Sequence, residues 1–161
     1  MDRYEEVLVA LRRIIRATDL HSRQLSKVAG LTAPQLLILQ LLKQHTELTA
    51  GEIAHGVSLS QATVTTILDR LEKRGFIERQ RGSTDKRKVF VHLTPAADDV
   101  LANAPKPLQE DFVQAFQALP DWEQTMILSA LERVAFMMDA QHIDASPFLH
   151  VGPLDQQATL P

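Results

Sequence analysis

Between residues 60 and 87 the chain carries an ordered series of polar side chains, with small groups first and cations after them. The series is Ser60, Gln61, Thr63, Thr65 and Thr66, followed by Arg70, Lys73, Arg79, Arg81, Lys86 and Arg87. Hydroxyl and amide groups can form hydrogen bonds with base edges, whereas Lys and Arg suit phosphate oxygens. This order predicts a segment that contacts bases, followed by residues that contact the phosphate backbone.

No residues have the spacing of a catalytic or metal site. The sequence lacks a G-x-S-x-G turn, a glycine-rich phosphate loop and an H-E-x-x-H zinc motif. It contains no cysteine, and its six histidines are scattered. A thiolate metal site is therefore excluded, and a histidine site is not expected. We predict no enzyme activity, no cofactor and no metal ion.

Two short helices must position these polar groups, and each has a start signal. Thr49 and Glu52 form a T-x-x-E capping box, and Gly56 suits the end of that helix. Ser60 can cap a second helix, which Gly75 ends. The second helix has one apolar stripe, formed by Val64, Ile67, Leu68 and Leu71. Helix, turn and capped helix together have the outline of a helix-turn-helix.

Two strands and a charged turn follow the second helix. Residues 76–81 alternate in part, and residues 88–93 are rich in β-branched and aromatic side chains. Residues 82–87 between them combine turn-forming and charged types. A basic hairpin tip beside a reading helix is a wing, and Arg87 can enter a narrow minor groove from it. Asp85, two residues earlier, is expected to orient the Arg87 guanidinium.

The segment up to Thr94 resembles the recognition helix and wing of the MarR family of bacterial transcriptional regulators. The matching parts are Leu71-Glu72-Lys73-Arg74-Gly75-Phe76-Ile77, Arg79, the D-x-R of Asp85 and Arg87, and Val91-x-Leu93-Thr94. The resemblance implies a homodimer, typically a repressor, that binds a pseudo-palindromic DNA site and is released by a small ligand. It also implies that Arg87 enters the minor groove, that Asp85 positions Arg87, and that residues 60–66 read the major groove.

Two other functions stay open at this point. A helix-turn-helix can be a protein-interaction module without DNA binding, and a basic hairpin can be a solvated loop. A small-molecule enzyme on a helical scaffold is the second alternative, and the lack of an acid–base cluster argues against it. The presence of helix, wing and D-x-R motif in this order favours DNA binding.

The charge distribution supports the same interpretation. The 161-residue chain has a formal net charge of −3. However, residues 60–93 hold eight Lys and Arg against four Asp and Glu, whereas residues 94–161 hold two against ten. The basic segment is therefore expected to face DNA and the acidic part to face away. No apolar run reaches the ~18 residues of a membrane span and no secretory signal is recognised, so we expect a cytoplasmic location.

The segments before the helix-turn-helix are predicted to be helical. A long helix is expected over residues 4–28, with a break near Asp19 left open and Gly30 at its end. Thr32 and Gln35 form a capping box for a second helix, which runs to about residue 44. That second helix is apolar on most faces, so it is expected to be buried under the reading helix.

Helices are also predicted after the wing. Thr94 can cap the first of them, and the family often has a glycine a few residues after this point where the present chain has Pro95-Ala96-Ala97-Asp98. Prolines at 105 and 107 predict a kink or break around residues 103–107. Asp121 is expected to cap the last helix, with Gln124 completing a capping box.

The predicted fold is mainly α with a small two-stranded β wing. A winged helix-turn-helix core at residues 31–94 lies between dimerisation helices at residues 1–30 and 95–142, and residues 143–161 form a tail. The C-terminal apolar positions are Leu108, Phe112, Phe116, Leu119, Ile127, Leu131, Val134 and Met138. They are too many for the small core to cover, so a second copy of the chain is expected to cover them.

A ligand pocket is implied only by the family resemblance. It is expected between the dimerisation helices and the winged helix. Arg12, Arg16 and His21 are candidate counter-charges for an acidic aromatic ligand, but the sequence assigns none of them and does not identify the ligand.

Overall fold

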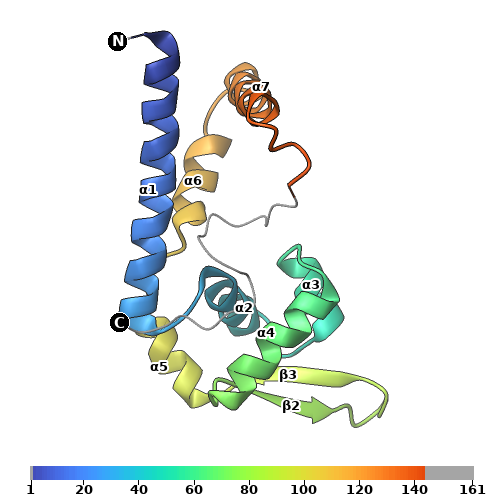
Figure 1. Ribbon diagram of the computed structural model, residues 1–161. Helices are drawn as coiled ribbons and strands as arrows, with labels where there is room; N and C mark the ends of the chain where they lie inside the picture. The colour runs from blue at the N-terminus through green and yellow to red at the C-terminus, as the bar shows by residue number, and fades with distance from the viewer. Residues whose placement is uncertain (1, 144–161) are drawn as a thin grey trace.

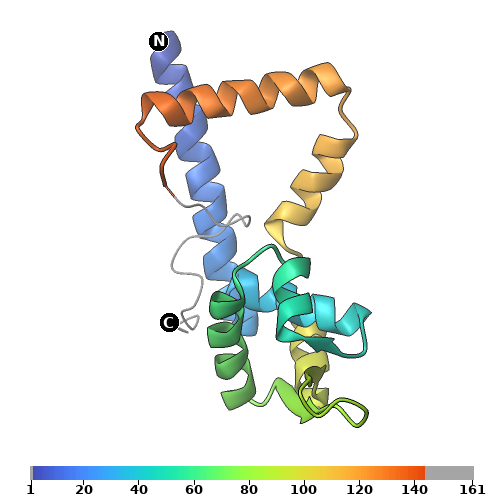
Figure 2. The same cartoon turned by 90° about the vertical axis from the view of Figure 1, so that its right-hand side faces the viewer.

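The computed structural model describes residues 2–143, which form seven helices and three short strands. In chain order these are α1 (Arg3–Ala29), α2 (Ala33–Gln44), β1 (Leu48–Thr49), α3 (Ala50–Gly56), α4 (Gln61–Lys73), β2 (Ile77–Arg81), β3 (Val89–Leu93), α5 (Pro95–Asn103), α6 (Leu108–Gln117) and α7 (Asp121–Met137). The winged-helix body, from α2 to α5, lies at one end of the molecule. The long helix α1 leads from this body to the opposite end, where α7 lies (Figure 1, Figure 2).

The predicted capping boxes are confirmed at the starts of α2 and α3. At α2 the Thr32 backbone N–H donates to Gln35 Oε1 at 3.0 Å, and the Gln35 N–H donates to Thr32 Oγ1 at 3.4 Å. At α3 the Thr49 N–H donates to Glu52 Oε2 at 2.8 Å, and the Glu52 N–H donates to Thr49 Oγ1 at 3.3 Å. These reciprocal bonds satisfy free backbone donors, so they fix where each helix begins.

The strands form one antiparallel sheet in the order β1-β3-β2. The sequence predicts only the β2–β3 hairpin, and the third strand is an addition to that prediction. In it Leu48 pairs with Val91 and Thr49 pairs with Phe90. A two-residue strand is too short to show an alternating pattern, and the sequence signal at Thr49 is that of a helix cap.

The apolar core lies within the body, and α2, α3, α4 and the sheet all contribute to it. Its fully buried side chains include Leu36, Ile38, Leu39, Ile53, Val64, Ile67, Leu68, Leu71, Ile77 and Val91. The helix α2 is therefore the buried supporting helix that its composition predicts. All four residues of the predicted α4 stripe are buried, so the opposite face of α4 is turned to solvent.

One point left open by the sequence is resolved, and one detail differs from the prediction. The helix α1 is continuous through Asp19, because this carboxylate forms ion pairs with Arg16 and Arg23 at 3.6 and 3.1 Å along the same helix. Thr94 precedes α5, but its side chain does not cap that helix. Its hydroxyl donates instead to the Gly75 carbonyl at 2.5 Å, which joins the end of the wing to the end of α4.

The predicted cap of the last helix is wrong by one residue. The cap position of α7 is Pro120, and Asp121 is already the first helical residue. The Gln124 side chain donates to the Leu119 carbonyl at 2.8 Å instead of forming a capping box. Proline fixes φ at a value that suits the extended residue before a helix, and no side chain caps the start of α7.

The predicted break around residues 103–107 is present between α5 and α6. Beyond it, neither α6 nor α7 has a buried residue. Exposed apolar side chains on these two helices include Phe112, Val113, Trp122, Met126, Leu128, Leu131, Phe136 and Met137. Tyr4, Val7, Leu8, Ile14 and Ile15 of α1 are exposed as well. One copy of the chain therefore leaves much of the apolar surface of α1, α6 and α7 uncovered.

Within residues 2–143 no single helix is long and apolar enough to cross a membrane. Only α1 and α2 taken together, with a bend of 61° between them, reach that length and composition. The α2 half of this pair is buried in the protein core.

Arg74 joins the end of α1 to the end of α4. The backbone at Gly30 is left-handed, with φ of 63°, which favours glycine at this helix end. Arg74 Nη1 donates to the Gly30 carbonyl at 2.6 Å, and its guanidinium carbon lies 4.7 Å from the centre of the Phe76 ring. Burial lowers the pKa of Arg74. The contact couples the orientation of α4 to that of the long helix α1.

Replacing Arg74 by alanine is expected to reduce the free energy of unfolding by roughly 1–3 kcal/mol, because it removes a charge-assisted hydrogen bond to a helix end. Chemical denaturation at a fixed protein concentration measures this change. The control is Lys73→Ala, since Lys73 is the exposed neighbour at the same helix end. A loss of stability no larger than that of the control contradicts the proposed link.

Candidate nucleic-acid interface

The polar residues predicted on α4 lie on its solvent-facing side. Gln61 and Thr65 are exposed, and Thr63 and Thr66 are half-buried. Ser60 is the cap: its Oγ accepts from the Thr63 backbone N–H at 3.1 Å and lies 2.8 Å from the Thr63 hydroxyl. Ser60 and Thr63 therefore hold the start of the helix, while Gln61 and Thr65 are presented to solvent.

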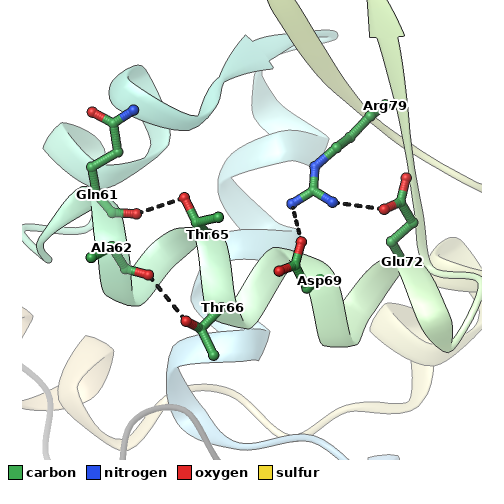
Figure 3. A network of polar contacts seen from close by, with 7 residues as sticks. All are labelled: Gln61, Ala62, Thr65, Thr66, Asp69, Glu72 and Arg79. Carbon is green, nitrogen blue, oxygen red and sulfur yellow. Dashed lines mark hydrogen bonds and ion pairs between the residues drawn. The ribbon is translucent and has the colours of Figure 1, made fainter.

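The threonine hydroxyls on the outer face are turned toward the helix backbone. Thr65 Oγ1 donates to the Gln61 carbonyl at 2.8 Å, and Thr66 Oγ1 donates to the Ala62 carbonyl at 3.2 Å (Figure 3). A hydroxyl has one hydrogen, so each side chain keeps only its oxygen as an acceptor and its methyl group for further contacts.

Arg79 of β2 links the wing to the outer face of α4. Its Nη2 forms an ion pair with Asp69 Oδ1 at 2.7 Å, and its Nη1 pairs with Glu72 Oε2 at 2.6 Å (Figure 3). The planar guanidinium thus spans one turn of α4 and bonds to one carboxylate with each terminal nitrogen. This arrangement holds β2 against α4 and places one positive charge between two carboxylates near the predicted reading surface.

The sequence predicts a phosphate contact for Arg79. In the structure two carboxylates engage its guanidinium, which favours a role in positioning α4 and the wing. The acidic partners lie ten and seven residues away on another element. One sequence signal points to this arrangement, because the alternation in β2 places Arg79 on the same side of the strand as the buried Ile77.

Replacing Arg79 by alanine is expected to weaken DNA binding by roughly tenfold, because two unpaired carboxylates then face the phosphates. Thermal stability should change little, since both acidic partners are solvent-exposed. Fluorescence anisotropy and a thermal melt measure the two effects. The combined variant Arg79→Ala, Asp69→Ala, Glu72→Ala should regain part of the affinity. No recovery in that variant would show that Arg79 contacts DNA directly.

The wing is closed by backbone hydrogen bonds across its turn. The Gly82 N–H donates to the Lys88 carbonyl at 2.8 Å, and the Lys88 N–H donates to the Asp85 carbonyl at 3.1 Å. A Cβ at Gly82 would lie 2.6 Å from the Asp85 carbonyl oxygen, so this tight turn requires glycine. The closed turn presents Lys86 and Arg87 at its exposed tip.

Asp85 orients Arg87 by a different route from the one predicted. Asp85 Oδ1 accepts a hydrogen bond from the Arg87 backbone N–H at 3.0 Å, which is a short-range turn contact rather than a pair with the guanidinium. The bond fixes the backbone at the wing tip and leaves the Arg87 guanidinium available for a partner.

Several cations near α4 and the wing are available for phosphate contacts. Within the described residues no ion pair involves Lys73, Arg81, Lys86, Arg87 or Lys88. Arg70 differs from them, because it is half-buried and its Nη1 is buried without a hydrogen-bond partner.

At the start of α3, hydrogen bonds from the Thr49 backbone and side chain lower the pKa of Glu52, which favours the charged carboxylate in the capping box.

The helix-turn-helix and wing are similar to those of known proteins. The model of the MarR family matches residues 31–89, which span the body from α2 to the first residue of β3. The HTH-type transcriptional regulator YsmB of Bacillus subtilis is 25% identical over 138 residues, which are 86% of this chain and 94% of YsmB.

The winged-helix segment at residues 31–89 thus matches the MarR family of transcriptional regulators, and YsmB, which is similar over most of the chain, is a transcriptional regulator as well. The family and these relatives are regulators rather than enzymes. Solved structures of similar proteins extend the likeness beyond the matched segment. ZitR of Lactococcus lactis has a TM-score of 0.61 and 24% identity, covering 86% of this chain and 99% of that one. BpsR of Bordetella bronchiseptica, whose DNA binding is regulated by 6-hydroxynicotinic acid, has a TM-score of 0.52 and 26% identity, covering 81% and 98%.

The chain also has a pocket of about 570 Å³ between α2 and α6. Its lining includes Leu37, Gln40, Lys43, Gln44, Glu110, Val113 and Gln114. The three counter-charges considered from the sequence do not line it. Arg16 pairs with Asp19, and His21 Nε2 lies 2.7 Å from the Lys106 carbonyl oxygen in the α5–α6 linker. Among residues 2–143 no group of histidines and carboxylates has the arrangement of a metal site.

Proposed function

We propose that this regulator binds duplex DNA as a homodimer and represses transcription by occupying a promoter. The observation that carries the proposal is the division of α4 into two faces. Its apolar stripe is fully buried in the core, so Gln61, Thr65 and their neighbours are held outward in a fixed register. Beside this face the wing presents unpaired cations at its tip, which suits phosphates and the minor groove.

The homodimer is supported by α7, which carries many exposed apolar side chains and no buried residue. Large apolar side chains that are exposed together mark an interaction surface, so the environment of α7 in a single copy is incomplete. A second copy covers α1, α6 and α7 most simply, because the same apolar surfaces exist on both protomers. Two-fold symmetry then presents two α4 helices about one DNA turn, ~34 Å, apart.

We further propose that a small ligand regulates binding from the pocket between α2 and α6. This pocket adjoins the supporting helix under α4 and one of the uncovered helices, so its occupant can change how the two are placed. Regulation of BpsR by 6-hydroxynicotinic acid is a precedent for a ligand among similar proteins. Lys43 and Glu110 supply opposite charges at the pocket, and the amides of Gln40 and Gln114 supply both donors and acceptors.

Fluorescence anisotropy of the DNA upstream of the protein's own gene tests the proposed function. If about three of the unpaired cations of each protomer contact phosphates, affinity should fall by about a thousandfold between about 50 and 200 mM salt. A duplex of unrelated sequence should bind more weakly at every salt concentration. Absence of salt-dependent binding to this DNA and to a random duplex pool would contradict the proposal and favour a protein-interaction module.

A further inference from the structure

The first two turns of α4, residues 61–68, carry no lysine or arginine on the solvent-facing side. From Gln61 onward the first cation is Arg70, which is half-buried. Arginine and lysine are the side chains that most often recognise guanine, by donating to its O6 and N7 atoms. The part of α4 that the proposed function places against base edges therefore has no such guanine-reading group.

The threonines on this face cannot replace that missing donor in the conformation observed. The hydroxyls of Thr65 and Thr66 donate to the carbonyls of Gln61 and Ala62, at 2.8 and 3.2 Å. The methyl carbons of both threonines lie on the side of the side chain away from these carbonyls (Figure 3). These methyl groups suit apolar contact with the C5-methyl group of thymine, which is the only methyl group in the major groove of unmodified DNA.

Cytosine is also disfavoured, because the carboxylate on this face is occupied. An aspartate can accept a hydrogen bond from cytosine N4. Asp69 Oδ1 instead lies 2.7 Å from Arg79 Nη2, and the other terminal nitrogen of Arg79 pairs with Glu72. The ion pair therefore engages one oxygen of Asp69 and makes this carboxylate a weaker acceptor for cytosine.

Gln61 is the remaining side chain with both a donor and an acceptor. It is the first residue of α4, it is exposed, and its amide extends away from the helix axis (Figure 3). Within residues 2–143 no hydrogen bond engages that amide. A glutamine amide matches the N6 donor and N7 acceptor of adenine in a bidentate pair.

We propose that α4 selects A·T pairs in each half-site, with Gln61 bonding to adenine and the methyl groups of Thr65 and Thr66 packing on thymine methyl groups. The inference rests on the proposed DNA binding and specifies which bases that binding recognises. The threonines then act in specificity through their methyl groups, while their hydroxyls stay bonded to the helix.

Selection of binding sites from a random duplex pool tests the base preference. Sites enriched by the full chain should contain A·T pairs at half-site positions whose preference relaxes in the Gln61→Ala variant. If those positions prefer G·C pairs, the inference is overturned while DNA binding stands. If no sequence is enriched and no duplex binds in a salt-dependent way, the proposed function fails and the inference fails with it.

Removing single methyl groups tests the role of the threonines on the selected site. Replacing the contacted thymines by deoxyuridine deletes only the C5-methyl group and is expected to weaken binding by about fourfold for each methyl lost. Thr65→Val keeps the methyl group and should bind like the wild type. Thr65→Ser keeps the hydroxyl, should bind more weakly, and should lose its sensitivity to deoxyuridine; the same pair of variants is made at Thr66.

Two results of the deoxyuridine and threonine substitutions would contradict the methyl contacts. Unchanged binding to the deoxyuridine site overturns them. Weaker binding by the valine variants than by the serine variants also overturns them, because it shows that the hydroxyls contact the DNA. Thermal melts of all four variants show whether a change in affinity arises from loss of folding.

Discussion

Replacing Leu131 by aspartate is expected to convert the protein from a dimer to a monomer and to remove tight binding to DNA. Leu131 lies on α7 and is 47% exposed in one copy, and we place it in the interface with a second copy. Two carboxylates, one from each protomer, would then be buried among apolar side chains without partners. That cost is about 3 kcal/mol or more in total, which weakens the dimer by at least about 100-fold.

The effect on DNA binding follows from the loss of the second reading helix. A monomer binds one half-site and loses the gain from linking two, which is about 10²–10⁴-fold. Sedimentation velocity measures the mass in solution, and anisotropy measures the affinity. The matched control is Glu132→Gln, which changes the charge of an exposed neighbour on α7 without removing apolar surface. A monomeric wild-type protein, or a Leu131→Asp variant that stays dimeric with full affinity, contradicts the proposed interface.

Replacing Arg87 by alanine is expected to weaken DNA binding by roughly 1–3 kcal/mol for each wing, and therefore by at least about 30-fold for the dimer. Arg87 is exposed at the wing tip, no described carboxylate pairs with it, and Asp85 fixes its backbone at 3.0 Å. The side chain is therefore available for the minor groove. Its removal should also reduce the dependence of affinity on salt, because one phosphate-attracting charge is lost per protomer.

The control for this prediction is Arg13→Ala, since Arg13 is an exposed arginine on α1 and its removal changes the net charge equally. Both variants should melt at the temperature of the wild type. If the Arg87 and Arg13 variants bind DNA with equal affinity, the wing tip makes no specific contact with DNA, and only the net charge of the protein affects binding.

The body of the fold can be predicted from sequence because its signals are local. The capping residues of α2, α3 and α4 lie within three residues of their partners, and the apolar stripe of α4 follows one helical period. The break before α6 also follows from the local chemistry of its two prolines. These features were sufficient to place the outer face of α4 and the tip of the wing.

The contacts that connect elements could not be predicted in the same way. The type of a residue does not show whether an arginine bonds to a phosphate or to a carboxylate, and Arg79 meets its two acidic partners only after β2 has folded back on α4. The link from Arg74 to Gly30 joins residues 44 positions apart. The strand β1 likewise exists only through pairing with β3, since its two residues carry no pattern of their own.

Hydroxyl-radical footprinting of a site bound by the wild type and by Arg87→Ala tests whether a homodimer places α4 and the wing tip on DNA. Two symmetric half-sites are expected with centres about 10 bp apart, and minor-groove protection by the wings should disappear in the variant. The protection around the reading helices should remain at protein concentrations that saturate the variant. A footprint of a single half-site, or a pattern that Arg87→Ala leaves unchanged, would contradict the account.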